Sequence, residues 1–136
     1  MKIKRFEDLN CWKEARKLRK IVSEITRKQY IRRDTIFCNQ IRSAALSVMS
    51  NIAEGFESVT DKESINFLNY ARRSCGEVRN HLYVALDDSY INEEEFEKLY
   101  EQACTAGKLI SGFISYLRKS SKSKKYRPSD YETIRQ

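Results

Sequence analysis

The chain has 136 residues, with 26 Lys or Arg, 19 Asp or Glu, and a formal net charge of +7 at pH 7. This length predicts a single domain that buries a core without disulfides or metals. No run of the sequence approaches the roughly twenty apolar residues of a membrane span, and residues 1–6 lack the apolar stretch of a signal peptide. We therefore expect a cytoplasmic protein that makes no membrane contact.

The first predicted helix runs from about Leu9 to Lys28 and is amphipathic. Its apolar side holds Cys11, Trp12, Ala15, Leu18, Ile21, Val22 and Ile25, with Arg19 at the edge. Its basic side holds Lys13, Arg16, Lys17, Lys20, Arg27 and Lys28. Only Glu14 and Glu24 oppose this charge, so the face is a candidate nucleic-acid-binding surface. A merely solvated, lysine-rich face has the same pattern.

A second helix is predicted after a short connection at Tyr30 to Arg33, from an Asp34 N-cap to Gly55. Small and apolar residues recur in it every three or four positions, which predicts a thin central helix. Asn51 and Glu54 lie beside this seam, where a buried polar group is costly unless it is hydrogen-bonded. We predict a structural role for both, with a functional site as the alternative. Gly55 either ends the helix or admits a second backbone.

Two further helices follow. The pair Thr60 and Glu63 forms a capping-box pattern that opens a third helix, which reaches about Asp88. The fourth helix opens at Asn92, and its apolar heptad predicts near-parallel packing in a bundle. That heptad consists of Phe96, Leu99, Ala103, Ala106, Ile110, Phe113 and Leu117. The sequence thus predicts an all-α, antiparallel, up-down-up-down four-helix bundle.

The second helix also carries a family motif. It is the run Asn51-Ile52-Ala53-Glu54-Gly55, preceded by Ser47 and Ser50, with matches in register at Phe6-Glu7-Asp8-Leu9, Trp12, Ala15, Gln40-Ile41-Arg42, Phe67-Leu68, Ala71-Arg72, Ser74 and Glu77. This pattern resembles the small four-helix bundle proteins encoded in intervening sequences of bacterial 23S ribosomal RNA genes. The resemblance implies a five-membered ring and does not point to an enzyme activity. A distantly similar set are accessory proteins of reverse transcriptases in diversity-generating retroelements.

Trp12, Asn51, Glu54 and Gly55 are the structural hallmark positions of this motif. Counted from the turn near Ile31, Trp12 and Asn51 are about equally distant. We therefore predict that Trp12 packs at the level of Asn51 and Ile52 and covers both Asn51 and Glu54.

The charge is uneven along the chain. Residues 1–33 hold twelve Lys or Arg against four acids, a net of +8, and residues 118–136 hold seven against two, a net of +5. We predict a bundle domain at residues 1–117 and a basic, flexible tail at residues 118–136. In an antiparallel bundle the tail and the start of the first helix share one end. The tail residues Lys122, Lys124 and Lys125 are therefore candidates for the same nucleic-acid-binding surface.

No catalytic pattern is evident in the sequence. It contains no Gly-rich phosphate loop, no Cys-x-x-Cys pair and no nucleophile–base pair, so we expect no cofactor, no metal and no enzyme activity. We predict a self-assembling bundle that binds nucleic acid, with RNA favoured by the genomic location of its relatives. The alternative is a protein-interaction scaffold, such as a partner of a reverse transcriptase or another nucleic-acid enzyme. In a third interpretation the charge serves solubility only.

Overall fold

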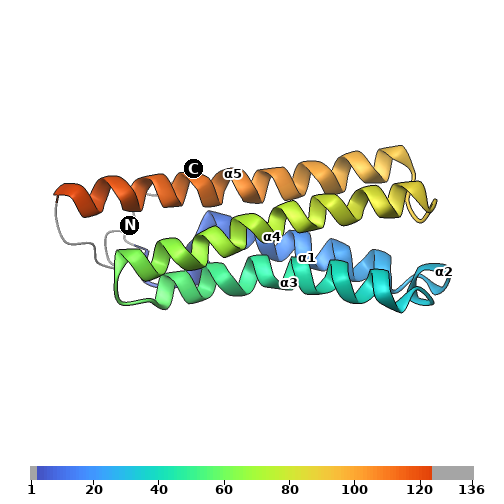
Figure 1. The fold of residues 1–136 in the computed structure, drawn as a ribbon, viewed down its shortest axis with the longest axis horizontal. Helices are drawn as coiled ribbons and strands as arrows, with labels where there is room; N and C mark the ends of the chain where they lie inside the picture. The colour runs from blue at the N-terminus through green and yellow to red at the C-terminus, as the bar shows by residue number, and fades with distance from the viewer. Residues whose placement is uncertain (1–2, 124–136) are drawn as a thin grey trace.

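The computed structural model describes residues 3–123, and the side chains of residues 3–120. Every regular element in this range is helical. The elements are η1 (Phe6–Asp8), α1 (Asn10–Thr26), α2 (Gln29–Arg32), α3 (Thr35–Glu57), α4 (Asp61–Asp87) and α5 (Glu93–Ser123). The four long helices alternate in direction, and α1 and α4 each pack against both α3 and α5 (Figure 1). The predicted antiparallel four-helix bundle is confirmed.

The predicted starts of the second, third and fourth long helices are confirmed by side-chain caps. Asp34 Oδ1 accepts a hydrogen bond from the backbone N–H of Phe37 at 3.0 Å, and this bond is the main reason that the pKa of Asp34 is lowered. Thr60 Oγ1 accepts from the backbone N–H of Glu63 at 3.2 Å. Asn92 and Glu95 cap each other's backbone N–H groups reciprocally, at 2.8 and 3.0 Å. Each cap satisfies donors that have no partner inside the helix.

The predicted ends of the helices are less accurate. Helix α3 continues past Gly55 to Glu57, and the predicted connection at Tyr30 to Arg33 contains the short helix α2. Helix α5 continues past the predicted end at Leu117 to Ser123, because Leu117 and Ser120 are both buried and extend its packed side by another turn. The helical part of the chain therefore extends into the predicted tail. Residues 124–136 lie outside the described residues.

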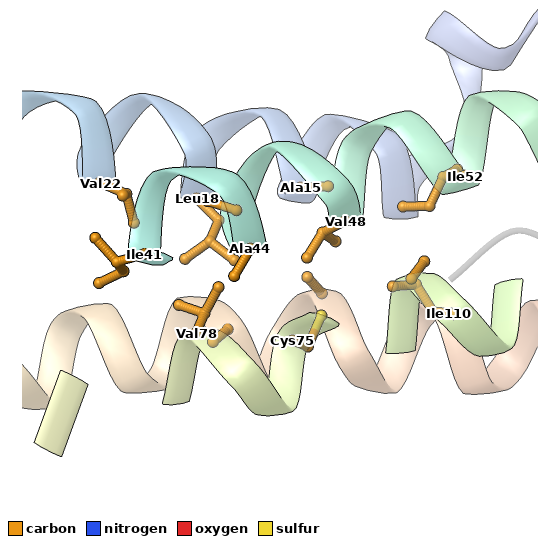
Figure 2. Close-up of a cluster of buried hydrophobic side chains, with 14 of the residues drawn as sticks. Ala15, Leu18, Val22, Ile41, Ala44, Val48, Ile52, Cys75, Val78 and Ile110 are labelled. Carbon is orange, nitrogen blue, oxygen red and sulfur yellow. The ribbon is translucent and has the colours of Figure 1, made fainter. Parts of the chain in front are cut away.

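The core is built of layers that cross all four long helices (Figure 2). Val22 lies beside Ile41, Leu18 beside Ala44, and Ala15 beside Val48, while Val78, Cys75 and Ile110 face them from α4 and α5. All of these side chains are at most 5% exposed. The same register, continued by one turn, places Trp12 at the level of Asn51 and Ile52, as the sequence predicted.

Three of the four cysteines belong to this core. Cys11, Cys38 and Cys75 are buried, and Cys104 is partly exposed. Burial raises the pKa of both Cys11 and Cys75 to about 12, so both thiols are protonated at neutral pH. Within residues 3–120 no cluster of three or more His, Cys, Asp or Glu has the arrangement of a metal site. None of the described helices has a stretch long and apolar enough to cross a membrane.

Candidate nucleic-acid interface

An open groove with a volume of about 970 Å³ runs along helix α1. Its lining consists of Arg5, Glu7, Trp12, Lys13, Arg16, Lys17, Arg19, Lys20, Ser23, Arg27 and Arg42. We call this surface the basic groove. Eight of these described residues are Lys or Arg and one is acidic, which gives them a formal charge of +7. A concave surface with charge of one sign concentrates counter-ions of the opposite sign.

Helix geometry aligns the Lys and Arg side chains of the groove. Arg16, Lys20, Ser23 and Arg27 follow one another at intervals of three or four residues, so they form one stripe along α1. Arg5 precedes η1, and Arg42 comes from the neighbouring helix α3. From Lys13 to Arg27 the helix rises about 21 Å. This length matches about six phosphates of a strand with the stacked spacing of a duplex.

Three of the long side chains contact a neighbouring residue of α1. The guanidinium of Arg16 lies over the ring of Trp12, 5.7 Å from its centroid. Arg19 Nη1 donates to Ser23 Oγ at 3.2 Å. Lys17 Nζ pairs with Glu14 at 3.0 Å, and this hydrogen bond is the main reason that the pKa of Glu14 is lowered. The charge of Lys17 is thus partly compensated.

Five of the bases predicted to bind nucleic acid line the groove: Lys13, Arg16, Lys17, Lys20 and Arg27. Lys28 does not line it. The chain leaves α1 after Thr26, and Lys28 Nζ pairs with Glu95 at the start of α5, at 3.3 Å.

The bases predicted from the tail have a different status. Lys122 lies in α5, but its side chain is not among the described ones, and Lys124 and Lys125 lie outside the described residues. No described residue of α5 lines the groove. The N-terminal end of α1 and the C-terminal end of α5 do lie at the same end of the bundle (Figure 1).

Three basic residues of the groove are absent from the predicted set: Arg5, Arg19 and Arg42. The sequence places Arg19 at the edge of the apolar side of the first helix, and in the structure this partly exposed side chain lines the groove. Arg5 and Arg42 lie outside that helix. Only the packing of η1 and α3 against α1 brings them to the groove.

The predicted role of Trp12 as a cover for two buried polar groups is wrong. Glu54 is exposed, and the amide of Asn51 donates to the backbone oxygen and to the hydroxyl of Ser47, both at 2.9 Å. Neither residue therefore needs a covering side chain. Trp12 is only partly buried; it packs against Phe6, with ring centroids 5.3 Å apart, and its ring lines the groove.

The hallmark positions Asn51 and Gly55 serve the contact between α3 and α4. Asn51 holds Ser47, and the hydroxyls of Ser47 and Ser74 are hydrogen-bonded across the two helices at 2.8 Å. Gly55 follows Ser47 by about two turns of α3. Its carbonyl oxygen accepts a hydrogen bond from the hydroxyl of the buried Ser64 at 2.8 Å. A Cβ atom on Gly55 would lie 3.2 Å from the backbone oxygen of Ser64. Of the two interpretations of Gly55, the close backbone approach is therefore the observed one.

The fold and the groove together define a small antiparallel helical bundle with one strongly basic concave surface. Residues 7–112 match the family described as 23S rRNA-intervening sequence protein, and the chain belongs to this family. The family resemblance seen in the sequence is thereby confirmed. No curated protein matches the sequence.

A solved structure shares the fold. It is the crystal structure of a protein of unknown function from the S23 ribosomal protein family, from Bacteroides thetaiotaomicron VPI-5482. The two chains are 19% identical with a TM-score of 0.72, and the match covers 77% of this chain and 95% of the other. At this level of identity the likeness concerns the fold.

Proposed function

We propose that this protein binds nucleic acid without catalysing a reaction, and that the basic groove is its contact surface. The observation that carries the proposal is the lining of the groove, in which eight bases face one acid. RNA is the favoured ligand, because the family is named for intervening sequences of 23S rRNA.

Binding in such a groove is electrostatic. Lys and Arg side chains that neutralise phosphates release condensed counter-ions, and this release supplies most of the affinity of sequence-independent binding. Lys13, Lys20 and Arg27 are suited to this role because all three are exposed. Contacts of this kind position a strand without reading its sequence.

A salt titration tests the proposal. With about six phosphates neutralised, the logarithm of the affinity for single-stranded RNA should fall linearly with the logarithm of salt concentration, with a slope of about −4. The measurement is fluorescence anisotropy of labelled RNAs of unrelated sequence at a series of salt concentrations. The affinities of these RNAs should agree at each salt concentration. Absence of binding at low salt contradicts the proposal.

Self-assembly is the second part of the proposal, with five subunits as the family resemblance implies. An aromatic cluster joins α4 to α5 away from the groove and supports this idea. The ring of Tyr83 lies 4.9 Å from Phe96 and 5.9 Å from Tyr100, and Tyr83 is half exposed. A ring of subunits repeats the groove and adds avidity to weak phosphate contacts. Native mass spectrometry should show a pentamer, and a monomer at micromolar concentration would contradict this part.

The same aromatic cluster favours a second candidate function. Aromatic side chains are enriched at protein–protein interfaces, so Tyr83 and its neighbours also suit a protein scaffold. Its partner would be a reverse transcriptase or another nucleic-acid enzyme, and the basic groove would then contact an acidic surface of that partner or help to hold the shared template. This candidate is preferred if purified protein fails to bind RNA.

A further inference from the structure

Among the described residues, Trp12 is the one aromatic residue in the lining of the basic groove. It is also the only tryptophan of the chain. The ring of Phe6 packs against it at an interplanar angle of 62°, and both rings contact the hydrophobic core. Trp12 is thus anchored by Phe6 and the core while part of its surface remains accessible from the groove.

The accessible part of Trp12 is occupied by a movable group. The guanidinium of Arg16 lies over the ring, 5.7 Å from its centroid, and Arg16 is an exposed residue. An exposed pair of this kind contributes little free energy, about 0.5–1 kcal/mol. A planar ligand can therefore displace the guanidinium at low cost, and Arg16 then remains close enough to contact a phosphate of the same ligand.

We infer that the basic groove takes single-stranded nucleic acid and that an unpaired base stacks on Trp12. This inference rests on the proposed function and specifies its ligand class. A base in a duplex already has both faces covered by its neighbours, whereas an unpaired base offers a free face to an aromatic ring. An aromatic ring flanked by a stripe of Lys and Arg side chains is the combination that binds single strands with little sequence preference.

The fluorescence of Trp12 tests the inference in the unmodified protein. A short single-stranded RNA should quench this fluorescence as it binds, because a base then contacts the ring. A duplex of the same length, titrated at a salt concentration at which anisotropy shows that it is bound, should leave the fluorescence nearly unchanged. Equal quenching by the two ligands overturns the inference.

Substitution at Trp12 provides a second readout. Trp12→Leu removes the stacking surface and should weaken binding of the single strand by roughly tenfold or more, with little change for the duplex. Trp12→Phe keeps an aromatic ring and should retain most of the preference for the single strand. The matched control is Tyr70→Leu, because Tyr70 is a half-exposed ring on α4 with the guanidinium of Arg73 over it at 4.8 Å, outside the groove. This control should bind both ligands like the wild type.

The outcomes separate the inference from the proposed function. If Trp12→Leu lowers the affinity for both ligands by the same factor, or changes neither affinity, the groove binds phosphates alone. The inference is then wrong while the proposed function stands. If the wild type binds neither ligand, the proposed function fails and the inference fails with it.

Discussion

Gly55→Leu is expected to destabilise the bundle by about 3 kcal/mol, as forced overpacking of a core does. A Cβ atom at this position lies 3.2 Å from the backbone oxygen of Ser64, and 3.4 Å from side-chain atoms of both Phe67 and Leu68. The remaining atoms of a leucine have no space unless α3 and α4 move apart. That movement also breaks the hydrogen bond from the hydroxyl of Ser64 to the carbonyl oxygen of Gly55.

The measurement is chemical or thermal unfolding at a fixed chain concentration, since assembly would make stability depend on concentration. A loss of 3 kcal/mol corresponds to a fall of roughly 10 °C in melting temperature. The matched control is Gly107→Ala in α5, where a Cβ atom would make an ordinary contact of 3.8 Å with Cys75. That substitution should stabilise the protein by up to about 1 kcal/mol, because alanine is the better helix former. A Gly55→Leu protein that melts like the wild type would show that α3 and α4 are farther apart than described.

The starts of α3, α4 and α5 could be predicted from the sequence because a cap is a local device. Asp34 and Thr60 each bond to a backbone N–H group three residues further on, and no tertiary contact is needed to recognise them. The ends depend on packing instead. Helix α5 continues past Leu117 because Ser120 is also buried, and the composition of this segment, rich in serine and lysine, gives no sign of that.

The polar hallmark residues show a different limit of sequence-based prediction. The periodicity placed Asn51 and Glu54 on similar sides of the helix, but it does not show which neighbour covers each side. In the structure Asn51 bonds to Ser47 beside α4, and Glu54 is exposed. The hydrogen bonds of Asn51 are those expected of a structural residue, whereas Glu54 is not buried.

The basic groove was predictable as far as a single helix defines it. Lys13, Lys20 and Arg27 follow from the period of α1 alone. Arg42 depends on the register of α3 against α1, which the sequence does not provide. Lys28 is instead predicted to share the basic face but does not line the groove. A projection at 100° per residue is valid only inside a helix, and Lys28 has extended backbone angles, with φ −60° and ψ 135°.

Neutralisation of three groove bases should have the largest effect on binding. The variant is Lys13→Gln, Lys20→Gln and Arg27→Gln, and all three residues are exposed and line the groove. If each base neutralises one phosphate of a single strand, the salt slope should become less steep by about 2. Extrapolated from 1 M salt, where the electrostatic contribution vanishes, this corresponds to a loss of affinity of roughly a hundredfold at 0.1 M salt. Unfolding should be nearly unchanged, because exposed charges contribute little to stability.

A second variant separates the position of the charges from their number. Lys62, Lys98 and Lys108 are exposed lysines outside the groove, and their replacement by glutamine removes the same three charges. The groove variant should lose affinity for all RNAs alike, while this control keeps a salt slope close to that of the wild type. Equal losses in the two variants would mean that only the net charge of the protein attracts RNA. An unchanged slope in the groove variant would exclude the groove as the binding surface and favour the scaffold function, because the bases along α1 would then contact no phosphates.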